Sequence, residues 1–362
     1  MTTDDFHEDD ARGELRKRLL ALEGPVFAVL DGAQFDDLPD LLLEGGFEHR
    51  PLYTARGQQG RKFDLTAPQL ILLHRNRTSA RPDDVGDISL TRPDSALNLS
   101  LLDRLLEVVA NRPIVFWECA QGEEALFKHL RSINMVRLAR DGDAENFDPA
   151  LQRTSEEVDG AEELDEVGHD DQITKEPPLV LFRHADANAL TYVLPALDPP
   201  TLARLHGPAN SIVLVRNTPG PIGSGIIAST RPHEQTQSSG PLVIGVSETR
   251  RIEENMEDAS TWETVEFLRD NLDEPIDHLD DVNLYRSVQE VEVRGFRLGL
   301  ETVAAHQLLA YLVHAFGDDV IDDYEFCQAS VEDGVSPDMA IDLIFEGFIE
   351  AAEADGVGNA RW

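Results

Sequence analysis

The sequence predicts an α/β protein with a mixed, largely parallel sheet and flanking helices, followed by a smaller helical lobe. From about 25 to 216, short apolar runs alternate with segments whose apolar residues recur at helical spacing, which is typical of strands separated by helices. After a stretch rich in Gly, Pro, Ser and Thr at 217–241, the pattern is helical. The 362 residues are enough for about two domains of ordinary size.

The α/β part contains five apolar runs and five helical patterns. The expected strands are Val26–Leu30, Gln69–Leu73, Ile114–Trp117, Leu179–Phe182 and Ser211–Val215. The expected helices are Ala33–Leu43, Leu97–Ala110, Gly122–Ile133, Asp186–Leu194 and Pro200–His206. We expect Asp186 to cap its helix, because its carboxylate can accept hydrogen bonds from the first free backbone N–H groups.

Two helices of the carboxyl-terminal part have clear signals. Gly299–Phe316 has apolar residues at helical spacing and stops at a glycine. The last helix is predicted to begin at Ser336 as N-cap, with Pro337 in the first turn and Asp338 where the helix dipole favours negative charge. We therefore expect a mainly helical lobe at 242–362.

The predicted domain plan follows from these shifts in pattern. It has an acidic flexible N-terminus at 1–16, an α/β domain at 17–216, a linker at 217–241 and the helical lobe. Within the α/β domain, 141–176 carries 14 acidic and two basic residues. Mutual repulsion and too few apolar side chains oppose packing there, so we expect an acidic loop insertion.

The charge balance excludes some classes of partner. The chain has 31 basic and 69 acidic residues, which gives a net charge of −38. Such a protein repels phosphate backbones and anionic lipids, so we expect neither nucleic-acid binding nor membrane insertion. No apolar stretch has the length of a membrane span, and the start of the sequence resembles no secretory signal, so the expected location is the cytoplasm.

The sequence contains no complete catalytic or metal-binding motif. Cys119 and Cys327 are too few for a disulfide framework or a zinc quartet, and we expect no cofactor and no metal. Gly220, Gly223 and Gly225 follow an apolar strand, but neither a lysine nor a helix pattern follows, as a phosphate loop requires. We therefore interpret these glycines as part of the linker.

Basic residues concentrate in one part of this acidic chain. Between Arg50 and Arg92 there are eight basic and four acidic residues. Such a contrast suits recognition of a protein partner. A candidate charged rim is formed by Arg56, Arg61, Lys62, Arg75 and Arg77.

Four stretches together resemble the domain-of-unknown-function 4123 family, the adaptor or chaperone proteins of bacterial type VI secretion. They are FAVLDGAQ at Phe27–Gln34, HRPLY at His49–Tyr53 leading to TAPQLILL, KHLRSINMVRL at Lys128–Leu138, and VLFRHADANALTYVLPALDPPTLARLHGP at Val180–Pro208. Their order and spacing match as well, over roughly 26 to 216. The sequence departs from the family where an alanine, Ala187, follows Asp186 in place of the usual proline, and in the length of 141–176.

The resemblance implies a non-enzymatic adaptor. Such proteins bind a cognate secreted effector, here expected through its N-terminal region, and help load it onto the spike protein of the secretion needle. The residues that match the family motifs, with a structural or partner-binding role, are Arg50, Tyr53, His129, Arg131, Phe182, Arg183 and Asp186. Two alternatives stay open: an enzyme with a site at the sheet edge near Arg183 and His129, and an acidic inhibitor of a basic partner protein.

Overall fold

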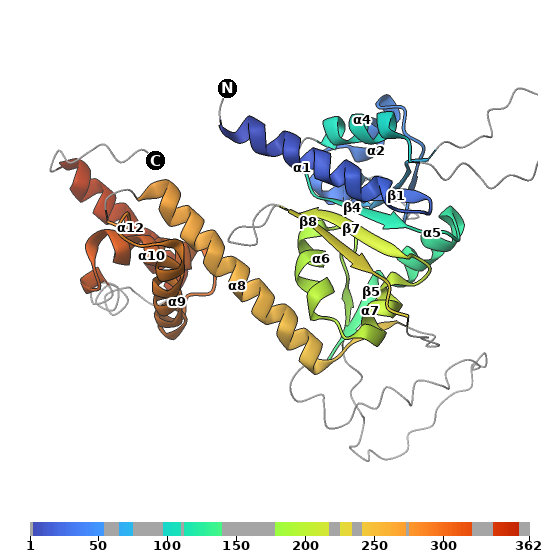
Figure 1. The fold of residues 1–362 in the computed structure, drawn as a ribbon. Coiled ribbons are helices and arrows are strands. Elements are labelled where there is room, and N and C mark those ends of the chain that lie inside the picture. Colours follow the sequence, from blue (N-terminus) through green and yellow to red (C-terminus); the bar gives the residue numbers. More distant parts are fainter. Residues whose placement is uncertain are drawn as a thin grey trace, which may run out of the picture. The chain divides into compact units, whose positions relative to one another are not determined.

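The computed structural model describes residues 3–53, 65–74, 97–109, 112–139, 178–216, 225–233, 241–272, 275–320 and 336–354. The chain divides into two compact units. Unit 1 comprises 1–217 and 224–253, and unit 2 comprises 218–223 and 254–362. The helices and strands of both units are labelled in Figure 1.

The main sheet of unit 1 has six strands, and every neighbouring pair in it is antiparallel. In spatial order the strands are β2 (His49–Pro51), β3 (Gln69–Leu72), β1 (Val26–Leu30), β4 (Ile114–Glu118), β7 (Ser211–Arg216) and β8 (Gly225–Thr230). The prediction of a largely parallel sheet is therefore wrong.

The physical reason lies in the position of β1. Helix α4 (Leu99–Val109) connects β3 to β4, and these two strands run in the same direction because each is antiparallel to β1. A helical crossover does join two parallel strands here, as the alternating pattern predicts. However, β1 lies between them and pairs with both, so the crossover produces no parallel neighbours.

A second, three-stranded sheet belongs to the same unit. Its order is β6 (Leu179–Leu181), β5 (Met135–Leu138) and β9 (Leu242–Ile244). In this sheet β5 is antiparallel to β6 and parallel to β9. Strand β6 is thus at an edge.

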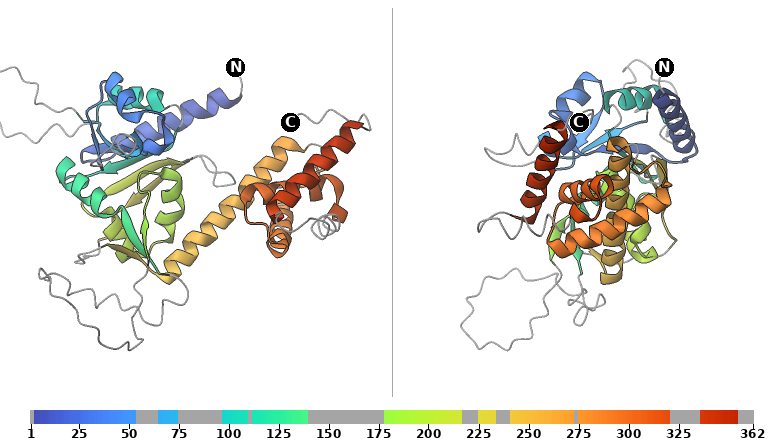
Figure 2. Two further views of the ribbon diagram at one scale, coloured as in Figure 1. Left: turned by 180° about the vertical axis from the view of Figure 1, so that it is seen from behind. Right: turned by 90° about the vertical axis from the view of Figure 1, so that its left-hand side faces the viewer.

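The strands β1, β3 and β4 of the main sheet are buried on both faces, and successive side chains of β1 enter different cores. Phe27 and Val29 of β1 join one core, while Val26, Ala28 and Leu30 join the other. Helices α1 (Thr3–Leu20), α2 (Leu38–Glu44) and α4 cover the second face. The first face is covered by α5 (Glu123–Ser132), α6 (Ala187–Val193), α7 (Pro199–His206) and the small sheet (Figures 1 and 2).

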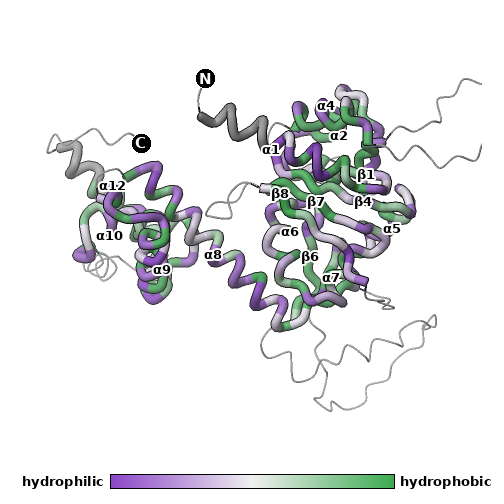
Figure 3. The backbone as a smooth tube through the Cα atoms, in the orientation of Figure 1, coloured by the Kyte–Doolittle hydropathy of each residue, from purple (hydrophilic) through white to green (hydrophobic). Residues whose placement is uncertain are grey.

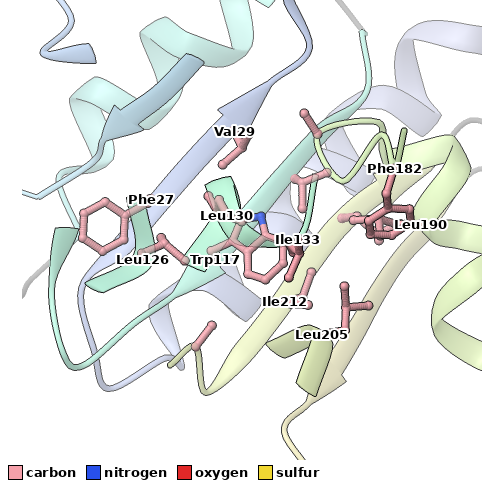
Figure 4. Packing of buried hydrophobic residues seen from close by; sticks show 14 of the residues in the cluster. Phe27, Val29, Trp117, Leu126, Leu130, Ile133, Phe182, Leu190, Leu205 and Ile212 are labelled. Atoms are coloured by element: carbon pink, nitrogen blue, oxygen red, sulfur yellow. The ribbon is translucent and has the colours of Figure 1, made fainter. Parts of the chain in front are cut away.

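Trp117 is at the centre of the core on the first face. It lies among Leu126, Leu130 and Ile133 of the α5 segment (Figure 4) and has no solvent exposure. Hydrophobic residues accordingly dominate the strands of unit 1 in Figure 3. Truncation of such a buried aromatic side chain typically costs about 3–5 kcal/mol of folding stability. This core fixes α5 and the β6–α6 region against the sheet.

The boundaries of the elements differ from the predicted domain plan in three places. Helix α1 begins at Thr3, inside the expected flexible stretch 1–16. Strand β8 lies inside the expected linker 217–241 and pairs with β7 over its whole length, because its Ile226 and Ile227 suit a sheet despite the surrounding Gly and Pro. Unit 1 also includes 242–253, which the plan assigned to the helical lobe.

Unit 2 is helical, as predicted for the carboxyl-terminal part. Its helices are α8 (Val246–Asn271), which begins in unit 1, α9 (Asp281–Leu298), α10 (Val303–Phe316) and α12 (Pro337–Ala354). Side chains of all four helices form one core, among them Leu268, Val288, Leu309 and Ile341.

The caps of these helices confirm one prediction and correct another. The Ser336 hydroxyl accepts a hydrogen bond from the Met339 backbone N–H at 3.3 Å, as expected for an N-cap. Gly299, however, does not begin a helix. With φ of 86° it ends α9 in the left-handed conformation, and Thr302 caps α10 three residues later.

Two further sequence features can be placed only in part. The acidic segment 141–176 and Cys327 lie outside the described residues, whereas Cys119 is a free, buried thiol. Over the described ranges, no helix combines the length and the apolar character that crossing a membrane requires.

Candidate functional site

The described family-motif residues gather in unit 1, around α5 and the turn between β6 and α6. Arg50 belongs to β2 and Tyr53 follows it, whereas His129 and Arg131 lie on α5. Phe182, Arg183 and Asp186 occupy the β6–α6 turn. They form three groups of contacts that connect distant parts of the chain.

The first group is an ion-pair cluster at the end of β1. The Arg183 guanidinium donates to Asp31 through Nε at 3.2 Å and Nη2 at 2.5 Å, and its Nη1 is 3.5 Å from Asp186 Oδ2. Asp31 is buried and also accepts a hydrogen bond from the Ala33 backbone N–H. The Asp31 carboxylate raises the pKa of Arg183 further above its ordinary value. The cluster therefore joins β1 to the β6–α6 turn.

Asp186 has a second role as the predicted N-cap of α6. Its Oδ1 accepts from the backbone N–H groups of Asn188 and Ala189 at 3.0 and 3.4 Å. The prediction of a capped helix is confirmed. Because Oδ2 faces Arg183, one carboxylate satisfies both the helix end and the ion pair.

The second group is a hydrogen-bonded chain through His184, which was not among the predicted site residues. The Tyr53 hydroxyl lies 3.1 Å from His184 Nε2 and 3.3 Å from the Leu130 carbonyl oxygen. Burial lowers the pKa of His184 to about 3, so the ring is neutral at pH 7. Its Nδ1 has no partner, which favours the tautomer in which Nε2–H donates to Tyr53 and Tyr53 donates to Leu130.

His129 is packed rather than exposed. Its Nε2 is 2.8 Å from the Leu205 carbonyl oxygen, and burial lowers its pKa. The ring lies against Gly207, where a Cβ atom would be 2.3 Å from the imidazole. Its ring thus fastens α5 to the end of α7, consistent with a structural role.

The third group surrounds Phe127 on α5. The guanidinium carbons of Arg50 and Arg131 lie 3.3 and 5.4 Å from the centroid of its ring. Arg50 also donates to Glu124 at 2.9 Å, and this bond lowers the pKa of the Glu124 carboxyl group. Cation–π and ion-pair contacts therefore hold the edge strand β2 against α5.

The structure describes Phe182 but not the candidate charged rim. Phe182 is buried in the core of the first face, with its ring centroid 6.4 Å from that of His184. The candidate charged rim lies outside the described residues; its members are Arg56, Arg61, Lys62, Arg75 and Arg77.

The motif residues thus chiefly make internal contacts, with other side chains of unit 1 and with its backbone. Arg183 has two carboxylate partners, and His129 and Tyr53 reach backbone carbonyls. In the part of the chain that the structure describes, no group of three or more His, Cys, Asp or Glu could hold a metal ion. The guanidinium groups of Arg50 and Arg183 retain solvent exposure and remain able to contact a partner.

Beside this cluster lies a surface that the sequence did not indicate. Leu179 and Leu181 of edge strand β6 are 47% and 67% exposed, while Val180 between them packs against the core. Among the described residues no strand pairs with the outer edge of β6. The run Leu179–Phe182 is wholly apolar, so it contains no alternation that could have marked one side as exposed.

Comparison with known protein families gives one match. Residues 26–147 match the family described as Domain of unknown function (DUF4123). The chain therefore contains a DUF4123 domain that includes Arg50, Tyr53, His129 and Arg131, whereas Arg183 and Asp186 lie beyond it, and Arg183 contacts it through Asp31. Neither the curated proteins nor the solved structures gave a match.

Proposed function

On the basis of the DUF4123 domain, we propose that this protein is a non-enzymatic chaperone and adaptor of type VI secretion. It binds a cognate effector through the effector's N-terminal region and helps load it onto the spike protein. Support comes from the resemblance of four stretches to such adaptors and from the structural use of their motif residues. A scaffold that holds its motif residues in internal contacts suits binding of a protein better than chemistry on a small molecule.

The observation that carries the proposal is the outer edge of β6, with which no strand pairs in the described part of the chain. An edge strand presents unpaired backbone N–H and C=O groups, and proteins ordinarily protect such edges with charge, Pro or a covering element. Strand β6 instead carries two exposed leucines, Leu179 and Leu181. An extended segment of a partner could add a strand to β6 and cover Leu179 and Leu181 with its own apolar side chains.

The position of β6 in the fold suits that role. Strand β6 pairs with β5 on its inner side, with Val180 opposite Val136. It leads directly into Phe182 and the Arg183–Asp31 ion pair, so its carboxyl end is anchored. A rigid edge reduces the entropy lost when a partner strand binds. We assign this edge to the effector.

The test is co-purification of the effector encoded beside this gene with variants of the edge. The variant carries Leu179→Asp and Leu181→Asp, and the control carries Leu43→Asp on α2, where the leucine is 69% exposed. We expect the edge variant to retain about one tenth or less of the effector and the control to retain all of it, because charge opposes burial of the edge.

Circular dichroism and thermal unfolding would check that both variants fold. Equal retention of the effector by the edge variant and by the control would contradict the assignment of the edge. Failure of the wild-type protein to retain either the effector or the spike protein would contradict the adaptor function itself.

A further inference from the structure

Unit 2 contains an acidic pocket of about 420 Å³ that the proposed function does not yet use. It is lined by residues of α8, α9 and the segment that begins α10. Five carboxylates line it: Glu254, Glu257, Asp258, Glu292 and Glu301. Its volume is within the range of about 300–1,000 Å³ that is typical of ligand pockets.

The negative charge of this pocket is not neutralised by nearby cations. No Lys or Arg is among the lining residues, and within the described ranges none of the five carboxylates forms an ion pair. Two of them accept hydroxyl hydrogen bonds, Asp258 from Tyr285 at 2.5 Å and Glu292 from Thr261 at 2.7 Å. Burial raises the pKa of Glu292, because the low-polarity surroundings disfavour the charged form of its carboxyl group. A bound cation would stabilise that charged form.

The pocket also has an apolar wall. Phe296 lines it with 63% of its surface exposed, beside the exposed Val293 and Val303. Tyr285 stacks on Trp262 with ring centroids 4.6 Å apart, which fixes the position of its hydroxyl. Exposed aromatic and aliphatic groups next to carboxylates match a cation that has a flat or apolar part.

A buried polar group in the wall points to a ligand independently of the acidic cluster. His306 lines the pocket with only 6% of its surface exposed, and neither ring nitrogen makes a well-formed hydrogen bond, although the Leu300 backbone lies close enough to oppose the effect of burial on the pKa of the ring. Its ring centroid is 4.4 Å from that of Phe296. Burial lowers the pKa of His306, so the neutral ring offers one donor and one acceptor. Peptide backbone supplies both complementary groups.

We propose that this pocket binds an arginine side chain carried by an extended, basic segment of a partner protein. The guanidinium pairs with the carboxylates while its plane stacks on Phe296, and its methylene stem packs on Val293 and Val303. The backbone of the segment reaches His306. This inference rests on the proposed function for the source of the segment, a protein bound by the adaptor.

Arginine suits the pocket better than two other cations. Lysine is a compact, strongly hydrated charge and gains less from an aromatic face and from two-point carboxylate contacts. The carboxylates of the described chain are not arranged as a metal site, so an elongated organic cation fits them better than a metal ion. A free guanidinium compound would leave His306 without its backbone partner.

The experiment is a titration of the full-length protein with the fluorescently labelled peptide acetyl-Gly-Arg-Gly-Arg-Gly-amide, followed by anisotropy. The pocket variant carries Glu257→Gln and Glu301→Gln, and the control carries Glu290→Gln and Asp342→Asn. Both pairs are exposed and remove the same charge, but the control positions do not line the pocket. We expect about tenfold weaker binding for the pocket variant and less than about twofold for the control.

A second variant removes the aromatic contact without changing charge. Phe296→Ala should weaken the arginine peptide about fivefold. A peptide with lysine should bind several-fold more weakly than the arginine peptide, and one with citrulline, which is neutral, should not bind detectably. Free arginine amide should compete only weakly, because it lacks the backbone that reaches His306.

If the pocket variant and the control weakened peptide binding equally, the proposal would be overturned, because the net negative charge of the protein would then explain the binding. The proposal would also fail if arginine and lysine peptides bound equally and Phe296→Ala had no effect. Since the titration uses no effector, its failure leaves the adaptor function intact. Conversely, peptide binding without any retention of effector would contradict the adaptor function alone.

Discussion

The Tyr53 hydroxyl lies 3.1 Å from Nε2 of His184, although 131 positions separate the two residues in the chain. The same hydroxyl is 3.3 Å from the Leu130 carbonyl oxygen on α5. One tyrosine thus connects the end of β2 with α5 and with the turn before α6. Tyr53 lies within the matched DUF4123 region, whereas His184 lies outside it, so the folded unit extends beyond that region.

Tyr53→Phe should lower the free energy of unfolding by about 1–2 kcal/mol, because His184 and the Leu130 carbonyl lose a buried partner. Urea unfolding followed by tryptophan fluorescence measures this. A background with Trp262→Phe and Trp362→Phe leaves Trp117 as the reporter for unit 1. An unchanged midpoint and slope would show that the hydrogen-bonded chain contributes nothing to stability.

Acid should destabilise unit 1 at a pH well above that at which carboxylates titrate. Burial lowers the pKa of His184 to about 3 and that of His206 to about 4, whereas the unfolded value is 6.5. Between these values the unfolded chain binds protons that the folded chain excludes, so the free energy of unfolding falls as pH falls below 6.5. Each histidine contributes about 1.4 kcal/mol per pH unit in that window.

The comparison of wild-type protein with His184→Gln between pH 7 and pH 5 isolates one of these residues. Glutamine does not titrate, so the variant should be less stable at pH 7 but lose less stability on acidification. Between pH 7 and pH 5 the wild-type protein should lose about 2 kcal/mol more stability than the variant, most of it below pH 6.5. Parallel slopes would mean that His184 is not held neutral by burial.

Gly207→Ala should destabilise unit 1 more than Gly122→Ala does. Both glycines have positive φ, 54° and 88°, so both substitutions introduce backbone strain of about 1–3 kcal/mol. A Cβ at 207 would also meet the His129 ring at 2.3 Å, whereas nothing lies within 4 Å at 122. Thermal unfolding of the two variants checks the order, which an equal loss for both would contradict.

Asp31→Asn should lower the free energy of unfolding by about 1–2 kcal/mol, since it weakens a buried, charge-assisted contact whose arginine partner is half-exposed and screened. The control is Glu14→Gln, which removes an exposed ion pair to Arg18 and should cost less than about 0.5 kcal/mol. Chemical denaturation of both variants provides the comparison. A smaller effect at 31 than at 14 would contradict the anchoring role of Asp31.

Local patterns predicted many elements of this fold because they report local chemistry. The strand Val26–Leu30 and the caps at Asp186 and Ser336 were expected and are present. The relative directions of neighbouring strands were not predictable in this way, because the position of β1 between β3 and β4 is set by tertiary packing. The edge strand β8 was hidden by the Gly and Pro residues around it.

The candidate site was only partly accessible to sequence reasoning. The resemblance identified Arg183 and Tyr53 as site residues but did not pair them with Asp31 and His184, which lie in the same family stretches, because residues more than 130 positions apart share no local pattern. The exposure of Leu181 depends on which face of β6 packs against the core, and the pocket around Phe296 depends on the packing of three helices. Neither property can be predicted from a short stretch of the sequence.

The most direct measurement is the soluble fraction of the effector encoded beside this gene, expressed with and without this protein in the same host. We expect most of the effector to be soluble and to co-purify with the protein when both are present, and to aggregate or be degraded when it is alone. The Leu179→Asp, Leu181→Asp variant should behave like the absence of the protein, whereas Leu43→Asp should behave like wild type. An effector that is equally soluble, and equally secreted, without this protein would contradict the adaptor function.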